Sequence, residues 1–205
     1  RFGETLGSPV TLRVTNADGV NWESKMAAFG EPMGPAVTAP RPGHADLGGC
    51  QKYDRRDVRD ILERASARET AARVAVGAVC RQLLEVCGMA VSSQVVSIGG
   101  ATGSAEQETR IAAAKAAGDT LGGCFELTAT GLLPGLGSHI QWDRRLDAKI
   151  AAAIVSIPAI KGVEFGAGFR SGDLPGSQVH DEIFYSPSQG YYRKTNRAGG
   201  IEGGM

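Results

Sequence analysis

Residues 41–88 read RPGHADLGGCQKYDRRDVRDILERASARETAARVAVGAVCRQLLEVCG and contain the clearest helix start in the chain. Ser66 and Glu69 have the S-x-x-E spacing of a capping box, in which the Ser66 hydroxyl accepts from the amide three residues on and the Glu69 carboxylate accepts from the Ser66 amide. A helix is therefore predicted to begin at Ser66. Gly88 is predicted to end it, because glycine readily adopts the left-handed conformation that stops a helix.

Small and apolar residues along this predicted helix follow the i, i+3, i+4 spacing of a buried face. They are Ala71, Val74, Ala75, Ala78, Val79 and Leu83. The spacing predicts that these side chains pack in a core.

The predicted helix start also has the composition of an anion site. The first turn of a helix presents free backbone amides and a partial positive charge. Arg64 and Arg68 flank that turn, and the planar guanidinium group suits phosphate and carboxylate oxygens. The expected ligand is therefore a phosphate or a carboxylate.

Several segments resemble the chorismate synthase family: RPGHAD at residues 41–46, KY at 52–53, ERASARET at 63–70 and NRAGGIEGG at 196–204. The resemblance runs along nearly the whole chain and rests on long motifs of rare residue types. It implies an α+β fold in which antiparallel sheets pack with helices as a β-α-β sandwich, in a single domain over residues 1–205. It also implies segments beyond both ends, carrying a second functional histidine, phosphate-binding arginines, further flavin contacts and a functional aspartate.

The resemblance implies a phosphate lyase that acts by anti-1,4-elimination. Phosphate and a ring proton leave 5-enolpyruvylshikimate 3-phosphate to give chorismate, in the last common step of the shikimate pathway towards aromatic amino acids. The implied cofactor is reduced flavin mononucleotide (FMN), although the reaction makes no net redox change. A homotetramer is implied, together with an NADPH-dependent flavin reductase activity that is either built in or supplied by a separate protein.

The resemblance assigns roles to single positions. The residues that match flavin contacts of the family are Arg64, Ala65, Ser66, Pro158, Ala159 and Gly203. Pro158 departs from the commoner Asn or Gln, so a side-chain hydrogen bond is expected to be lost there. Gly203 is expected to let the backbone approach the cofactor closely, because it has no side chain. Arg68 matches a residue that holds the substrate.

His44 is the predicted catalytic residue, because histidine exchanges a proton near neutral pH. It follows residues 30–43, whose proline and glycine content predicts an ordered loop rather than a helix or strand. The alternative is a structural histidine that only hydrogen-bonds Asp46 or a backbone carbonyl. The resemblance favours proton transfer, with His44 as the donor to the reduced flavin.

Other charged residues are interpreted structurally. Arg55, Arg56 and Arg59 are expected to pair with nearby acidic residues on a solvated surface. The run His180-Asp181-Glu182 is expected to be loop structure rather than a metal site, because consecutive residues of an extended chain point to opposite faces. No metal is predicted. Two rival functions stay open: a non-catalytic fragment of the family fold, and an unrelated phosphate-binding module without flavin.

The remaining pattern predicts alternating strands and helices without the apolar runs of a doubly wound parallel sheet. Strands are predicted at residues 9–15, 91–98, 123–129 and 161–165, with a turn at 16–19. A helix over 104–117 is predicted to start with a capping box at Ser104, and one over 146–157 to be capped by Asp143. Residues after 165 are predicted to form a glycine-rich loop.

Composition limits the expected partners. The 22 basic residues balance 22 acidic ones, so nothing favours a nucleic acid or an anionic membrane. Hydrophobic residues make up 42% of the chain, with no apolar run near the about 18 residues that span a bilayer. We therefore expect a soluble, cytoplasmic protein. The cysteines are expected to be reduced, small core residues: Cys50, Cys80, Cys87 and Cys124.

Overall fold

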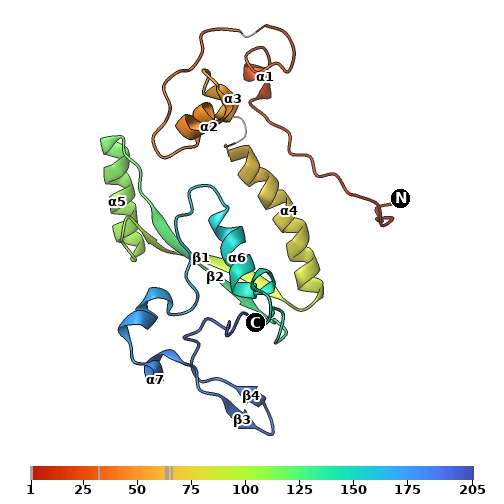
Figure 1. The fold of residues 1–205 in the computed structure, drawn as a ribbon, viewed down its shortest axis with the longest axis vertical. Helices are drawn as coiled ribbons and strands as arrows, with labels where there is room; N and C mark the ends of the chain where they lie inside the picture. The colour runs from red at the N-terminus through yellow and green to blue at the C-terminus, as the bar shows by residue number, and fades with distance from the viewer. Residues whose placement is uncertain (1, 32, 63–64, 66) are drawn as a thin grey trace. The chain divides into compact units, whose positions relative to one another are not determined.

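The structure is a computed structural model that describes residues 2–31, 33–62, 65 and 67–205 (Figure 1). Contacts group the chain into two compact units, one formed by Arg1–Ala78 with Gly137–Met205 and the other by Val79–Leu136. The single domain over the whole chain stays a prediction.

The second unit is built on an antiparallel strand pair. β1 (Ala90–Ile98) runs alongside β2 (Gly123–Thr130), with a register shift between Val95 and Ser97. α5 (Ser104–Ala117) links the two strands (Figure 1). The two predicted strands and the helix between them are therefore confirmed.

The start of α5 differs from the predicted capping box. Gly103 is the N-cap residue, with an extended ψ of 138°, and Ser104 is already helical. The Gln107 side chain donates to the Ala101 carbonyl instead of returning to a cap, at 3.2 Å. The predicted stop is confirmed, because Gly118 has a φ of +68° and its amide bonds the Ala114 carbonyl.

α4 (Ala67–Val86) confirms the predicted long helix and its end. Gly88 has a φ of +78°, and the amide that follows it, from Met89, donates to the Leu84 carbonyl at 2.9 Å. This is the hydrogen bond expected of a glycine-terminated helix. The predicted N-cap, Ser66, lies outside the described residues.

The predicted buried face of α4 is wrong in this structure. Val74 and Leu83 are 67% and 66% exposed, and only Ala71 and Ala75 of that face are half-buried. Helical spacing identifies an apolar face, but it does not supply the partner that buries the face.

The first unit begins with an extended segment in place of the predicted strand at residues 9–15. Val10 and Val14 are exposed, and the described part of the chain provides no strand that pairs with this segment. Alternation alone cannot form a strand, since each strand needs a neighbour for its amides and carbonyls. The predicted turn is confirmed by a 3.1 Å bond from the Gly19 amide to the Asn16 carbonyl, and it leads into α1 (Gly19–Trp22).

Two short helices follow the proline-rich loop. Residues 33–41 contain neither helix nor strand, as predicted, and α2 (Asp46–Tyr53) and α3 (Arg59–Leu62) come after them. The helices touch where Gly49 meets Ile61: a Cβ on Gly49 would lie 2.6 Å from the Ile61 side chain. The missing side chain therefore lets α2 and α3 share a small core.

α6 (Leu146–Val155) confirms the third predicted helix, but its predicted cap is wrong. Asp143 lies inside the 3₁₀ helix η1 (Trp142–Arg144), and Arg145 is the N-cap residue, without a side-chain cap. The helix ends before Pro158, as expected. Apolar residues at helical spacing along this segment are half-buried: Leu146, Ile150, Ile154 and Ile157.

The chain after α6 corrects two further expectations. Residues 161–165 have no regular structure, so the strand predicted there is wrong. The predicted glycine-rich loop contains η2 (Gly168–Asp173), α7 (Gly176–Val179) and an antiparallel hairpin of β3 (Phe184–Ser186) and β4 (Gly190–Tyr192). Aromatic rings pair across the hairpin, Phe184 with Tyr192 at 5.7 Å between centroids and Tyr185 with Tyr191 at 5.2 Å.

The predicted α+β class with antiparallel sheets is confirmed. The cysteines are free, as predicted, but their predicted core role is wrong, because Cys50 is half-buried and the other three are exposed. None of the helices in the described part of the chain combines the length and the apolarity that a membrane crossing requires.

Candidate active site

His44 lies on the loop immediately before α2, and its side chain is exposed. Its Nδ1 is 2.9 Å from the Pro42 carbonyl oxygen. A carbonyl only accepts hydrogen bonds, so Nδ1 carries the proton of the neutral ring and Nε2 is left as the second exchange site. A structural histidine was expected to hydrogen-bond Asp46 or a backbone carbonyl, and the bond to the Pro42 carbonyl is present. This bond leaves Nε2 available for proton exchange.

Asp46, two residues further on, is completely buried and forms a forked ion pair with Arg41. Its Oδ2 accepts from the Arg41 backbone amide and from Nε, both at 2.9 Å, and its Oδ1 accepts from Nη2 at 3.1 Å. These bonds, the guanidinium ones first, lower the pKa of Asp46 to about 2. The carboxylate is therefore ionised at neutral pH.

This ion pair predicts a specific acid dependence of stability. The pKa of an aspartate in an unfolded chain is about 3.9, whereas the pKa of Asp46 in the folded protein is about 2. Between these two pH values the folded state therefore binds fewer protons than the unfolded state. The stabilisation is complete above about pH 4 and is lost as the pH falls towards about 2. We expect Asp46→Asn to lower the free energy of unfolding by a constant amount from about pH 7 to 4 and by less at lower pH, measured by urea unfolding. If the difference in the free energy of unfolding between Asp46→Asn and the original protein did not shrink in acid, Asp46 would not form an ionised pair.

The predicted anion site at the start of α4 is described in part. Arg64 and Ser66 lie outside the described residues, and Ala65 is exposed, with its amide 3.2 Å from the Leu62 carbonyl. Arg68 is exposed and lines an open cavity of about 830 Å³ in the first unit. Apolar side chains and two further cations share that lining: Trp22, Met26, Leu62, Lys25 and Arg59.

A side-chain bridge joins α4 to the end of α6. Arg73, just over one turn after Arg68, donates from Nη1 to the Ser156 hydroxyl at 2.8 Å and from Nε to Glu69 at 2.6 Å. Ser156 precedes Pro158 by two residues. The bridge therefore links the second turn of α4 to the residue two before Pro158, across a sequence separation of 83 residues.

Pro158 and Ala159 form a turn at the end of α6, and Ala159 has a φ of +71°. A left-handed alanine is uncommon and strained, and such residues cluster at functional sites. Gly203 has a φ of +64°, and a Cβ there would meet no atom within 4 Å. Its backbone therefore has open space beside it, as a close approach by a ligand requires.

The segment that carries Gly203 is attached to the other end of α6. The Gly204 carbonyl accepts from the Ser138 amide at 3.1 Å and from the Leu146 amide at 2.8 Å. Since α6 has ten residues, the Ala159 turn and Gly203 flank a helix about 15 Å long. The structure does not bring these two predicted contacts together directly.

Asp181 has a structural role that the sequence pattern did not indicate. It is 7% exposed, and it accepts from the amides of Arg197 and Ala198 at 2.9 Å and from the Thr195 hydroxyl. The pKa of Asp181 is lowered to about 2, first by the Ala198 amide. This carboxylate therefore anchors the start of the NRAGGIEGG segment. In the sequence, Asp181 is simply one acidic residue within a polar loop, so no local pattern indicates this role.

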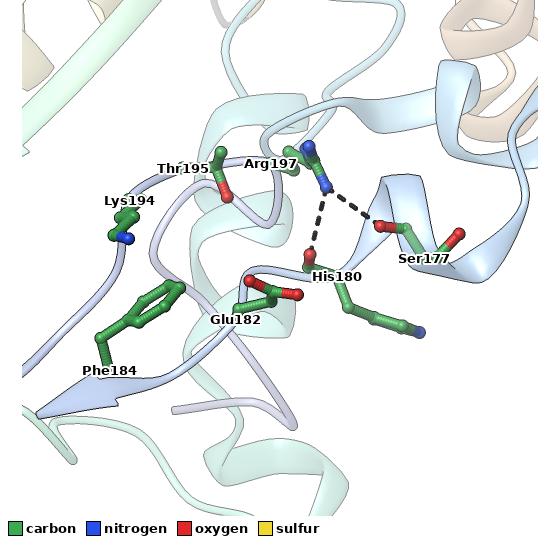
Figure 2. A pocket seen from close by; sticks show the side chains of 7 residues that line it. All are labelled: Ser177, His180, Glu182, Phe184, Lys194, Thr195 and Arg197. Atoms are coloured by element: carbon green, nitrogen blue, oxygen red, sulfur yellow. Dashed lines mark hydrogen bonds between the residues drawn. The ribbon is translucent and has the colours of Figure 1, made fainter.

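A small cavity of about 160 Å³ lies beside this anchor (Figure 2). Arg197 donates from Nη1 to the carbonyls of His180 at 3.3 Å and Ser177 at 3.4 Å, and Lys194 lies 4.1 Å from the Phe184 ring centre. The loop interpretation of His180-Asp181-Glu182 fits this geometry. Among the described residues, no group of three or more His, Cys, Asp or Glu side chains is placed to hold a metal.

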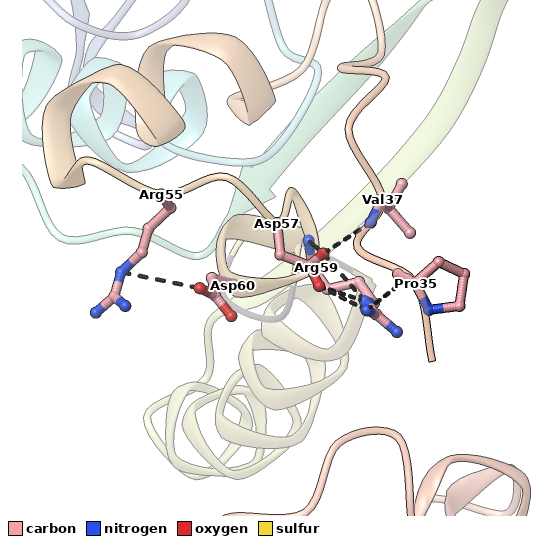
Figure 3. Close-up of polar contacts among 6 residues, drawn as sticks. All are labelled: Pro35, Val37, Arg55, Asp57, Arg59 and Asp60. Carbon is pink, nitrogen blue, oxygen red and sulfur yellow. Dashed lines mark hydrogen bonds and ion pairs between the residues drawn. The ribbon is translucent and has the colours of Figure 1, made fainter. Parts of the chain in front are cut away.

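Arg55 and Arg59 form ion pairs with nearby acidic residues, as expected, but only the Arg55 pair is solvated, because Arg59 and Asp57 are half-buried (Figure 3). Arg59 contacts Asp57 through Nη2 at 2.5 Å and donates to the Pro35 carbonyl at 2.9 Å. Arg55 contacts Asp60 at 3.8 Å. The pKa of Asp57 is lowered to about 2, mainly by the hydrogen bond from Arg59.

Comparison with known proteins gives consistent matches. The family model for chorismate synthase matches residues 1–205. The chorismate synthase of Caldanaerobacter subterraneus subsp. tengcongensis is 54% identical over 205 residues, which cover all of this chain and 57% of that protein. The chorismate synthase of Aquifex aeolicus is 49% identical over 241 residues, covering all of this chain and 61% of that protein. A crystal structure of chorismate synthase has a TM-score of 0.75 and 48% sequence identity, over 78% of this chain and 58% of that chain.

The α+β fold with antiparallel sheets agrees with these matches. This chain therefore belongs to the chorismate synthase family. The resemblance read from RPGHAD, ERASARET and NRAGGIEGG is thereby confirmed. The chain spans about three fifths of the length of the relatives given above, between 57% and 61%.

Proposed function

We propose that the full-length protein is a chorismate synthase, a lyase that converts 5-enolpyruvylshikimate 3-phosphate into chorismate and phosphate in the shikimate pathway. The observation that carries this proposal is the family match over residues 1–205, at about half identity to proteins named chorismate synthase. One C–O bond to phosphate and one ring C–H bond break, and the electrons of the C–H bond complete the new double bond. The substrate gains and loses no electrons overall.

The proposed cofactor is reduced FMN, which when bound supplies electron density transiently to the substrate ring. Residues of this chain fit such a group. Arg73, in the second turn of α4, donates to Ser156 just before the turn of Pro158 and Ala159, and Gly203 has open space beside its backbone. We assign cofactor binding to the matching residues Arg64, Ala65, Ser66, Pro158, Ala159 and Gly203.

The site must stabilise a departing phosphate and manage a proton. Arg68, at the N-terminal turn of α4, supplies a planar cation near backbone amides that favour negative charge. His44 donates its transferable proton from Nε2 of the doubly protonated ring, because the Nδ1 proton is committed to the Pro42 carbonyl. We therefore assign substrate binding to Arg68 and proton donation to His44.

The family also supports proposals about the setting of the enzyme. We propose a homotetramer in the cytoplasm, with an NADPH-dependent flavin reductase activity that keeps FMN reduced. Nucleic acids and membranes are not proposed as partners.

Arg68→Lys should separate substrate binding from flavin binding in the full-length protein. Lysine keeps the charge but loses the two-pronged contact, so we expect the KM for the substrate to rise about 10–100-fold, the equivalent of one charge-assisted hydrogen bond. The Kd for FMN, measured by fluorescence titration, should change far less. Arg81→Lys, in the other unit and paired with Glu85, is the control. Equal losses of substrate and flavin affinity would contradict the role given to Arg68.

Thermal unfolding with and without flavin tests the proposal against its rivals. A chorismate synthase is expected to show a Tm that rises with FMN and rises further when 5-enolpyruvylshikimate 3-phosphate is added, because each ligand binds only the folded state. An unrelated phosphate-binding module would respond to inorganic phosphate and not to FMN. The absence of any flavin effect on the full-length protein would overturn the proposed function.

A further inference from the structure

Asp46 is a completely buried side chain at the end of an exposed loop. Residues 41–45 are all exposed, whereas Asp46 has no accessible surface. An ionised carboxylate is costly to bury unless charged and polar groups compensate it. Its hydrogen-bond donors are the backbone amide and the guanidinium of Arg41, five residues earlier in the chain.

These bonds close a small ring in the backbone around His44. The two ends of the loop are held together by the Arg41 backbone and guanidinium groups on one carboxylate. Within the ring, proline fixes the φ of Pro42, and Gly43 occupies the left-handed region at +72°. Few backbone torsions are therefore left free between His44 and the Arg41–Asp46 ion pair, which is called the clamp below.

The Pro42 carbonyl is the atom that this ring presents to His44. It lies 2.9 Å from Nδ1 and can only accept, so it selects the ring tautomer with the proton on Nδ1. If the loop opened, the exposed His44 side chain could rotate away, and its hydrogen bond to the Pro42 carbonyl would be lost for part of the time. The contact therefore depends on the loop geometry that the ion pair maintains.

We propose that Asp46 is a positioning residue for His44: its ion pair with Arg41 holds the loop so that the Pro42 carbonyl keeps Nδ1 protonated and Nε2 exchanges the catalytic proton. This inference rests on the proposed function of His44. Asp46 is assigned no contact with substrate or cofactor. It acts through the backbone and through the orientation of one ring.

Asp46→Asn is the direct kinetic test in the full-length enzyme. Asparagine preserves the shape of the side chain but removes the charge and turns an amide group towards the Arg41 guanidinium. We expect kcat to fall about 10²-fold, the scale of a misplacement of roughly 1 Å, while the KM for the substrate stays close to its original value.

Asp57→Asn is the matched control. Asp57 also accepts from the backbone amide and the guanidinium of one arginine, Arg59, and its pKa is lowered to the same value of about 2. It lies outside residues 41–46, which form the ring around His44. A loss of kcat in Asp46→Asn no larger than in Asp57→Asn would overturn the positioning role, because it would then reflect general destabilisation.

¹⁵N NMR of the histidine rings tests the same inference without activity. The His44 signals, assigned by their loss in His44→Asn, should show Nδ1 protonated in the original protein, and a mixture of tautomers in Asp46→Asn but not in Asp57→Asn. An Nε2-protonated ring in the original protein would overturn the inference. If the tautomer behaves as expected and His44→Asn still turns over normally, the proposed function of His44 fails while the clamp stands.

Arg41→Lys gives a second variant should Asp46→Asn fail to fold. Lysine keeps the charge and the backbone amide contact but loses the fork, so a smaller shift of the His44 tautomer is expected in the same NMR measurement. If Arg41→Lys had the same His44 tautomer as the original protein and as the control Asp57→Asn, the clamp would be contradicted.

Discussion

Replacing His44 by Asn in the full-length enzyme is expected to lower kcat by about 10²–10⁴-fold, the loss typical of removing a general acid. Asparagine keeps a hydrogen-bonding group on the loop but cannot carry a transferable proton. The substrate KM should change little, because His44 is assigned no binding role. Steady-state assays across the pH range should also show a changed pH profile, because a proton-transferring group has been removed.

His139→Asn is the control for this variant. His139 is an exposed histidine of the same unit without an assigned role, and its replacement should leave both kcat and the pH profile unchanged. Normal turnover in His44→Asn, with an unchanged pH profile, would contradict the assignment and place the proton donor elsewhere.

Gly166→Ala is expected to cause the largest loss of stability. Gly166 has a φ of +57°, and a Cβ there would lie 2.0 Å from the Arg197 carbonyl oxygen and 2.4 Å from the Gly199 amide nitrogen. Left-handed strain and steric overlap together cost roughly 2–5 kcal/mol. The NRAGGIEGG segment must then move away, so FMN affinity should fall as well. Urea unfolding and flavin titration measure the two effects.

Gly162→Ala is the matched control, because it lies four residues earlier, with no left-handed φ and no atom within 4 Å of the added Cβ. It should change the free energy of unfolding by only a few tenths of a kcal/mol. If Gly166→Ala proved as mild as Gly162→Ala, the close approach of residues 166 and 199 would not be needed for the fold.

Local signals predicted the second unit well. Residues 91–98 have strand composition and residues 123–129 alternate, each strand has the other as its neighbour, and the helix between them ends at a glycine that adopts the left-handed conformation. Residues 9–15 show the same alternation, yet they form no strand, because pairing depends on a second segment that the local pattern does not contain. The apolar face of α4 was misjudged for the same reason.

The hairpin of β3 and β4 was missed because its strands are too short for periodicity to detect. Three residues cannot establish alternation, and the surrounding glycines favour a loop interpretation. Cross-strand aromatic pairs stabilise it instead, and these pairs become visible only when Phe184 and Tyr192 are known to face each other.

The candidate site residues came from motif resemblance, whereas their supporting contacts came from the structure. RPGHAD marks His44, but the burial of Asp46 and the bond from His44 to the Pro42 carbonyl depend on how the loop folds back on Arg41. Likewise, the bridge between Arg73 and Ser156 crosses more than eighty residues of sequence. Contacts of this kind follow from tertiary structure and leave no local pattern.

The most direct test of the account is an anaerobic assay of the full-length protein with 5-enolpyruvylshikimate 3-phosphate and FMN. With chemically reduced FMN, chorismate and phosphate are expected to appear in equal amounts, and with oxidised FMN neither should form. No chorismate with reduced FMN, or an equal rate without flavin, would contradict the assignment of this chain to a flavin-dependent chorismate synthase.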